Sequence, residues 1–177
     1  RGKVIYLPYM HPLYVDFYNY FNGNQDYFEC HEVLEEYWKE VAPGDKEHVL
    51  VGLVQLATGM YHWRRSNFSG AARILTKSLH NIKRNEQSIF LKPLNLPLLE
   101  TQLLQSISQV EQHKPFHSFK IDIVDCELKK LVDKRILEQP KSDEHFLLHK
   151  HMLRDRTEIL NARAAKIGLT KDNSGKN

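Results

Sequence analysis

The feature that most constrains this chain is a series of segments with helical periodicity, separated by short clusters of turn residues. Apolar side chains recur three and four residues apart, as on the buried face of a helix. The clusters at Gly23, residues 42–45 and residues 67–70 contain residues that end one helix or cap the next. Only 8 glycines and 7 prolines occur in 177 residues, so turns are few. The sequence therefore predicts an all-α fold.

About six or seven helices are predicted, and the predicted N-caps are Asn24 or Asp26 for the second helix, Asp45 for the third and Ser142 for the seventh. Pro93 and Pro97 predict a loop between the fourth and fifth helices. The alternation of residues 116–124 is weak, which predicts at most a short extended piece and no sheet. The predicted helices cover residues 10–21, 26–41, 45–66, 71–86, 98–112, 125–138 and 142–167.

An internal sequence similarity between two segments indicates how these helices associate. The segments that begin at Asp26 and Asn67 share the order cap, aromatic, small residue and apolar pair. Their offset exceeds the ~34 residues of a tetratricopeptide repeat, and two copies fall short of the roughly three that a solenoid needs. We expect a bundle of stacked helical hairpins, with tetratricopeptide-like packing left open. Residues 10–115 are predicted as a helical core domain and residues 116–170 as a carboxy-terminal helical extension.

Charge, hydropathy and cysteine usage limit the partners. The net charge is only +3, which gives no electrostatic reason to expect nucleic acid or anionic lipid as the main partner. No run of about 18 apolar residues predicts a membrane span. Cys30 and Cys126 are too few for a disulfide framework and are expected to be free thiols. We expect a cytoplasmic protein without nucleic-acid or membrane partners; a homo-oligomer or a protein partner stays open.

The predicted helix at residues 26–41 carries the first candidate site residues. At about 100° per residue, Cys30 and Leu34 fall on its apolar face. His31 and Glu35 fall at the margin of that face, and their spacing of four brings an imidazole and a carboxylate side by side. The pair could supply two ligands to a divalent cation, or the carboxylate could orient the imidazole ring.

The next helix offers further polar residues. Gln55 and His62 lie seven residues apart, flanked by Gly52 and Gly59 at the same spacing. Glycine inside a helix costs about 1 kcal/mol relative to alanine, so the pair indicates the close approach of another backbone. We expect this side of the helix to face the His and Glu of the preceding one. The predicted polar cluster consists of His31, Glu35, Gln55 and His62, with Trp38 in a supporting position.

These residues also resemble a known family. His31, Glu35 and Trp38 form the pattern H-x-x-x-E-x-x-W, and residues 52–57, Tyr61-His62 and Asn67 with Gly70-Ala71 follow it. The combination resembles the uncharacterised bacterial and archaeal family called domain of unknown function 309, over about residues 21–79. The resemblance implies an all-helical fold and a metal site at His31 and Glu35. No reaction comes with the family.

Two functions remain open. The first is the binding of a divalent metal ion by His31, Glu35 and His62. His62 is included because zinc prefers a third protein ligand. In an enzymatic form, Glu35 would be base or ligand and His31 ligand or proton carrier. The alternative is a tetratricopeptide-like protein-interaction scaffold, in which the polar cluster only fixes hairpin packing and the outer helix faces bind a protein. The zinc-protease motif, the ferritin-like ligand set, the nucleophile elbow and the phosphate-binding loops do not occur in the sequence.

Overall fold

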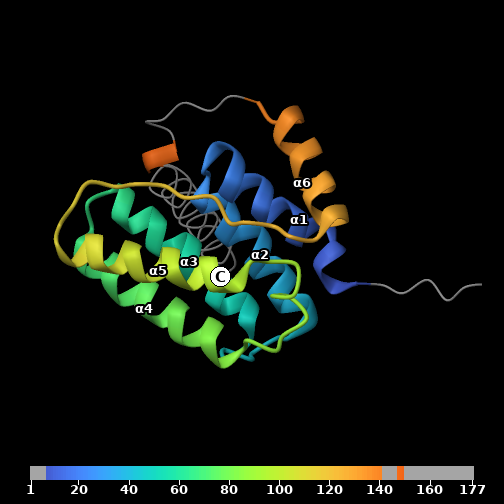
Figure 1. The fold of residues 1–177 in the computed structure, drawn as a ribbon, viewed down its shortest axis with the longest axis horizontal. Coiled ribbons are helices and arrows are strands. Elements are labelled where there is room, and N and C mark those ends of the chain that lie inside the picture. Colours follow the sequence, from blue (N-terminus) through green and yellow to red (C-terminus); the bar gives the residue numbers. More distant parts are fainter. Residues whose placement is uncertain (1–6, 141–146, 150–177) are drawn as a thin grey trace, which may run out of the picture. The chain divides into compact units, whose positions relative to one another are not determined.

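The computed structural model describes residues 7–140 and 147–149, and this part of the chain is all-α (Figure 1). It contains no β-strand; an isolated antiparallel bridge joins Leu94 to Ile123. None of its helices combines the length and apolar character that crossing a membrane requires. The elements are η1 (Pro8–Met10), α1 (Pro12–Tyr18), the π-helical η2 (Asn19–Asn24), α2 (Tyr27–Val41), α3 (Val49–Arg64), α4 (Phe68–Arg84), α5 (Leu96–Glu111) and α6 (Cys126–Glu138).

These elements all lie in the first of two compact units, which ends at residue 142. The predicted seventh helix at 142–167 lies outside the described residues except for residues 147–149, which are helical. The proposed division into residues 10–115 and 116–170 stays a prediction.

Side-chain caps explain where several helices begin. Asp26, Asn67, Asn95 and Asp125 each accept a hydrogen bond from the backbone N–H three residues further on. Such a cap satisfies one of the backbone donors that a helix start leaves without a partner. The predicted starts near residues 26 and 125 are therefore confirmed.

The start of α3 differs from the prediction. Asp45 does not cap this helix; its side chain accepts from the Glu47 N–H at 3.0 Å within the connecting turn. His48 is the N-cap instead, and its Nδ1 accepts from the Leu50 N–H at 3.1 Å. The helix consequently begins at Val49, later than the aspartate predicted.

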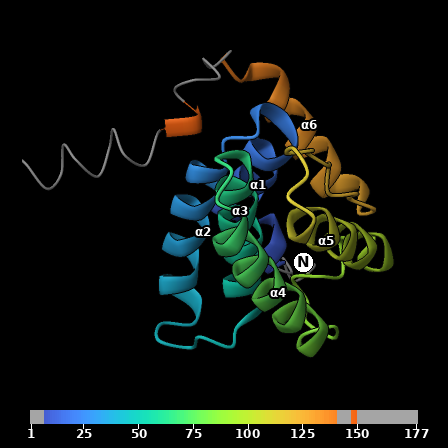
Figure 2. The same cartoon turned by 90° about the vertical axis from the view of Figure 1, so that its left-hand side faces the viewer.

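Helices that follow one another in the chain pack against one another. Each of the pairs α1–α2, α2–α3, α3–α4 and α4–α5 is in contact, and α6 lies against α1 and η2 (Figures 1 and 2). The prediction of stacked helical hairpins is therefore confirmed. Large aromatic side chains fill much of the core between them. They include Tyr14, Phe17, Tyr18, Phe21, Tyr27, Tyr37 and Trp63.

The chain between α5 and α6 is extended and belongs to no sheet; the Asn22 side chain and an isolated backbone bridge hold it. The Asn22 Nδ2 donates to the Ile121 carbonyl at 2.9 Å, and the Ile121 N–H donates to the Asn22 Oδ1 at 2.8 Å. The bridge to Leu94 holds its other edge. This segment therefore joins η2 to the start of α5, in keeping with the predicted extended piece.

Candidate functional site

His31 and Glu35 lie side by side on α2, as their spacing predicts. The His31 Nε2 is 3.3 Å from the Glu35 Oε2, and the His31 Nδ1 is 3.3 Å from the Glu32 Oε1. The two side chains are about a third exposed, at 37% and 34%. They sit at the margin of the buried face, while Cys30 and Leu34 are fully buried.

Lys39 also binds this carboxylate. Its Nζ is 2.9 Å from the Glu35 Oε1, so each oxygen of Glu35 already has a partner within the helix. The hydrogen bond from Lys39 lowers the pKa of Glu35, against a smaller opposing effect of burial, and His31 lowers it further. Glu35 is therefore a carboxylate at neutral pH, and a metal ion would compete with the lysine for it.

The glycine-flanked side of α3 does not face α2, and that prediction is wrong. A Cβ at Gly52 would lie 2.2 Å from the Asn81 Oδ1, and one at Gly59 would lie 2.5 Å from a Leu75 methyl carbon. Both neighbours belong to α4, and the Ser78 hydroxyl donates to the Gly52 carbonyl at 2.7 Å. The close approach that the glycines indicate is real, but its partner is the following helix.

Gln55 and His62 lie toward α4 for the same reason. Gln55 lines a hollow together with Lys77, His80 and Asn81 of α4. The His62 Nδ1 is 3.1 Å from the Asn67 Nδ2, at the α3–α4 turn.

The surroundings of His62 do not favour a cation. Burial lowers the pKa of His62, and the positive charges of Arg65 and Arg73 lower it further. The site is therefore electropositive, whereas a metal ion needs anionic or strongly donating neighbours.

The predicted ligands are not assembled into one site. Across residues 7–140, no hydrogen bond or ion pair joins His31 or Glu35 to Gln55 or His62. The described part of the chain also holds no group of three His, Cys, Asp or Glu side chains that could bind a metal ion. The structure brings together His31 and Glu35 and leaves His62 with a different set of neighbours.

Trp38, the third residue of the motif, has a clear structural contact. Its Nε1 donates to the Asp45 carbonyl at 2.8 Å. The bond fastens the turn between α2 and α3 onto the last part of α2. This contact supports hairpin packing rather than a reaction.

The contacts of Arg64 with a backbone carbonyl and two aromatic rings were not predicted from the sequence. The Arg64 Nη1 donates to the Gln25 carbonyl at 2.8 Å, and the guanidinium lies 4.8 Å from the centre of the Tyr27 ring and 5.8 Å from that of Phe116. Gln25 has a left-handed backbone, with φ of 56°. Arg64 thus ties the start of α2 to the end of α3, through partners too distant in sequence for periodicity to reveal.

The thiol next to the motif is inert. Cys30 is fully buried, and its Sγ donates to the Phe17 carbonyl at 3.4 Å. Burial raises its pKa well above the ordinary value. Cys30 is therefore not a thiolate nucleophile beside His31.

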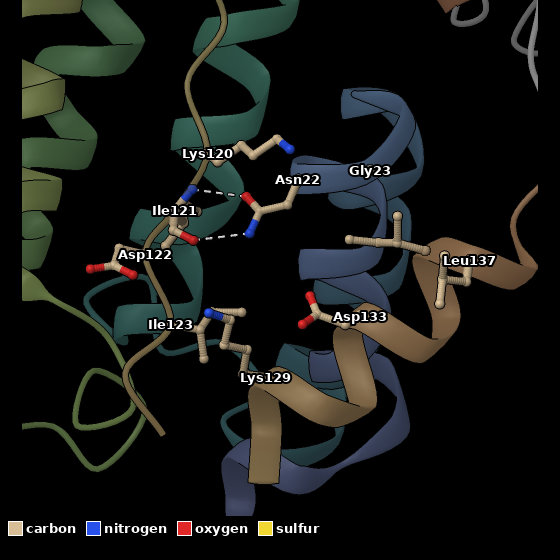
Figure 3. A pocket seen from close by; sticks show the side chains of 10 residues that line it. Asn22, Gly23, Lys120, Ile121, Asp122, Ile123, Lys129, Asp133 and Leu137 are labelled. Atoms are coloured by element: carbon tan, nitrogen blue, oxygen red, sulfur yellow. Dashed lines mark hydrogen bonds between the residues drawn. The ribbon is translucent and has the colours of Figure 1, made fainter. Parts of the chain in front are cut away.

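A surface pocket of about 540 Å³ lies between η2, the extended segment and α6 (Figure 3). Lysines and aspartates alternate around it, with Lys120 and Lys129 against Asp122 and Asp133. The Asn22 amide on its wall is already bound to the backbone of the extended segment.

Comparisons with known proteins agree with the residue pattern. A family model described as a domain of unknown function (DUF309) matches residues 14–74. The chain is similar to the uncharacterized protein YpuF of Bacillus subtilis (strain 168), with 36% identity over 169 residues, which cover 89% of this chain and 95% of YpuF. No solved structure matches the chain.

Proposed function

This chain belongs to the DUF309 family, and from that premise we propose that it is a non-catalytic binding scaffold of helical hairpins, whose outer helix faces take a macromolecular partner. The polar residues of the H-x-x-x-E-x-x-W motif serve the packing and the surface of α2 in this proposal. The observation that carries it is that Gln55 and His62 lie against α4 and not against the pair on α2.

The contacts of the motif support a structural role. His31, Glu35 and Lys39 form a chain of ion pairs along α2, and Trp38 binds the turn that follows. Each of these contacts lies within one hairpin. A catalytic acid–base pair needs a pocket and a group whose pKa is shifted toward neutral pH. Glu35 instead lies at the surface, and its pKa is lowered.

Metal analysis tests the proposal. Protein purified without chelator is examined for zinc, manganese and nickel by elemental analysis, and then titrated with each ion by calorimetry. The scaffold predicts no stoichiometric metal and no binding at micromolar concentration. It further predicts that His31→Ala lowers the free energy of unfolding by less than about 1 kcal/mol, since exposed ion pairs contribute little. His117→Ala, which removes another exposed histidine, is the matched control.

A divalent-metal site is the second candidate function. It is favoured by the 3.3 Å approach of the His31 Nε2 to the Glu35 Oε2 on an accessible surface. Such a site would hold the ion with these two side chains and water, and His62 would not complete it without movement of α3. Stoichiometric metal that is lost in His31→Ala and retained in His117→Ala would establish this candidate and refute the scaffold without metal.

A further inference from the structure

Acidic residues are concentrated on α2, whereas α3 and α4 have basic residues and no acidic ones. Residues 48–85 contain six lysines and arginines and no aspartate or glutamate. The remaining residues therefore sum to a net charge of −3, and α2 alone has five glutamates and one lysine. The small net charge of the whole chain conceals this division.

Four of the five basic residues of α4 share one exposed face. Arg73, Lys77, His80 and Arg84 are all exposed and follow one another at spacings of four, three and four. At about 100° per residue they fall within an arc of about 60°. The row extends over about 16 Å of helix at 1.5 Å per residue.

The turn that leads into α3 adds Lys46 to this surface. At one end, Lys46 and Arg84 border a hollow of about 220 Å³ that Gln55 also lines. At the other end, Arg65 and Arg73 are close enough to His62 to lower its pKa, in addition to the effect of burial. We call the surface formed by Lys46, Arg73, Lys77, His80 and Arg84 the basic face.

Few acidic groups neutralise the basic face. Glu47 pairs with Arg84 at its edge. Within residues 7–140, neither Arg73 nor Lys77 takes part in an ion pair. On α6, by contrast, Lys130 pairs with Glu127. A row of basic residues on a rigid helix, in which only Arg84 has an acidic partner among residues 7–140, attracts a polyanion with regularly spaced charges.

We propose that the basic face binds the phosphate backbone of a nucleic-acid duplex, without reading its sequence. The duplex spaces phosphates about 3.4 Å apart along each strand, so the row on α4 extends past about five of them. Arg73, Lys77 and Arg84 have long cationic side chains, which contact phosphate oxygens and discriminate poorly among bases in the absence of deep groove insertion. This inference rests on the proposed scaffold function and names its partner.

Two other polyanions fit the basic face less well. A membrane-binding surface requires apolar side chains that enter the lipid, and the large exposed apolar residues of the described chain lie outside α3 and α4. A single-stranded nucleic acid requires exposed aromatic rings on which bases stack. On α3, Tyr61 and Trp63 are buried, and on α4 the Phe68 ring is stacked on His113 at 4.5 Å.

Fluorescence anisotropy with labelled DNA and RNA duplexes of unrelated sequence tests the proposal. Each phosphate contact contributes a slope of about −0.9 to the logarithmic salt dependence, so four cations give about −3.6. Raising salt from about 50 to about 200 mM should then weaken binding by about 150-fold. The affinity should be similar for duplexes of unrelated sequence.

Two charge-reversal variants with the same change in net charge locate the surface. Arg73→Glu/Lys77→Glu should weaken binding at least about tenfold and make the slope shallower by about 2, because two phosphate contacts are lost. Lys130→Glu/Lys134→Glu on α6 should change affinity by less than about threefold, because charges beyond a Debye length are screened. If the first variant fails to fold by circular dichroism, Arg73→Gln/Lys77→Gln replaces it.

Several results would overturn the inference. These are no binding at low salt, equal losses in the two variants, binding only to phosphatidylserine vesicles, or salt-sensitive self-association of the chain without duplex binding. A negative result here leaves the scaffold proposal standing, because the metal measurements test that separately. Stoichiometric metal would refute the scaffold without metal, and the anisotropy measurements would still show independently whether the basic face binds a duplex.

Discussion

Replacing Gly59 by alanine tests the close approach of α3 and α4 directly. The added Cβ would lie 2.5 and 2.6 Å from two side-chain carbons of Leu75 and 3.3 Å from its backbone nitrogen. Ordinary carbon–carbon contacts lie at about 3.5–4.0 Å. Leu75 is fully buried, so it has no open space into which to turn. The two helices must therefore separate locally to admit one methyl group.

The expected change in the free energy of unfolding for Gly59→Ala follows from two opposed effects. Alanine in place of glycine stabilises an exposed helix by about 1 kcal/mol, whereas overpacking a well-packed core costs about 1–3 kcal/mol. The contact with Leu75 involves its branching carbon and not only a terminal methyl, so we take the upper half of the second range. We expect Gly59→Ala to lower the free energy of unfolding by about 1–2 kcal/mol. For a chain of this size, the melting temperature falls by roughly 2–8 °C.

Urea unfolding followed by tryptophan fluorescence measures this change, with the denaturant slope unchanged. A double-mutant cycle with Leu75→Ala provides the control, because the truncated side chain leaves room for the new methyl. The cycle should show a favourable coupling of about 2–3 kcal/mol between the two substitutions, which is the overpacking cost that the smaller side chain relieves. A Gly59→Ala protein that is more stable than the wild type would refute the reasoning.

Three further predictions follow from single contacts. Lys39→Gln should raise the pKa of Glu35 toward its ordinary value in a carboxyl NMR titration. In the wild type, the lowered pKa of Glu35 adds a small contribution to stability at pH values above the pKa of Glu35 in the unfolded chain. This contribution is lost as the pH falls through the pKa of Glu35 in the folded protein. Ellman's reagent should modify Cys126 in the native protein and Cys30 only in urea, since one is exposed and the other buried. Asn22→Ala should cost about 1–3 kcal/mol in urea unfolding, because two backbone groups of the extended segment lose their partners.

The fold was largely predictable because the signals that set it are local. Asp26 and Asp125 cap helices where the sequence places them, and the predicted loop at residues 87–97 ends one residue after α5 begins. Asp45 failed as a cap because its carboxylate is used inside the turn, where Glu47 offers a nearer backbone N–H. His48, which caps α3 instead, is not a residue that the sequence marks as a typical N-cap.

The candidate site was less predictable because it depends on which helices are neighbours. A helical wheel gives the relative directions of Gly52, Gln55 and Gly59 but not the helix that each direction meets. Since α3 is buried on more than one side, α2 and α4 were both available for the glycine side. Charge segregation, in contrast, is visible in residues 48–85 and was missed because the charge was summed over the whole chain.

The contact between Asn22 and Ile121 also has a consequence for biosynthesis. It joins residues 99 positions apart, and both polar groups are buried. While the ribosome still holds residue 121, the amide of Asn22 has no counterpart, although the hairpins of α2, α3 and α4 can already form from near neighbours. The two hydrogen bonds of Asn22 to the extended segment therefore form only late in translation, after residue 121 has left the ribosome.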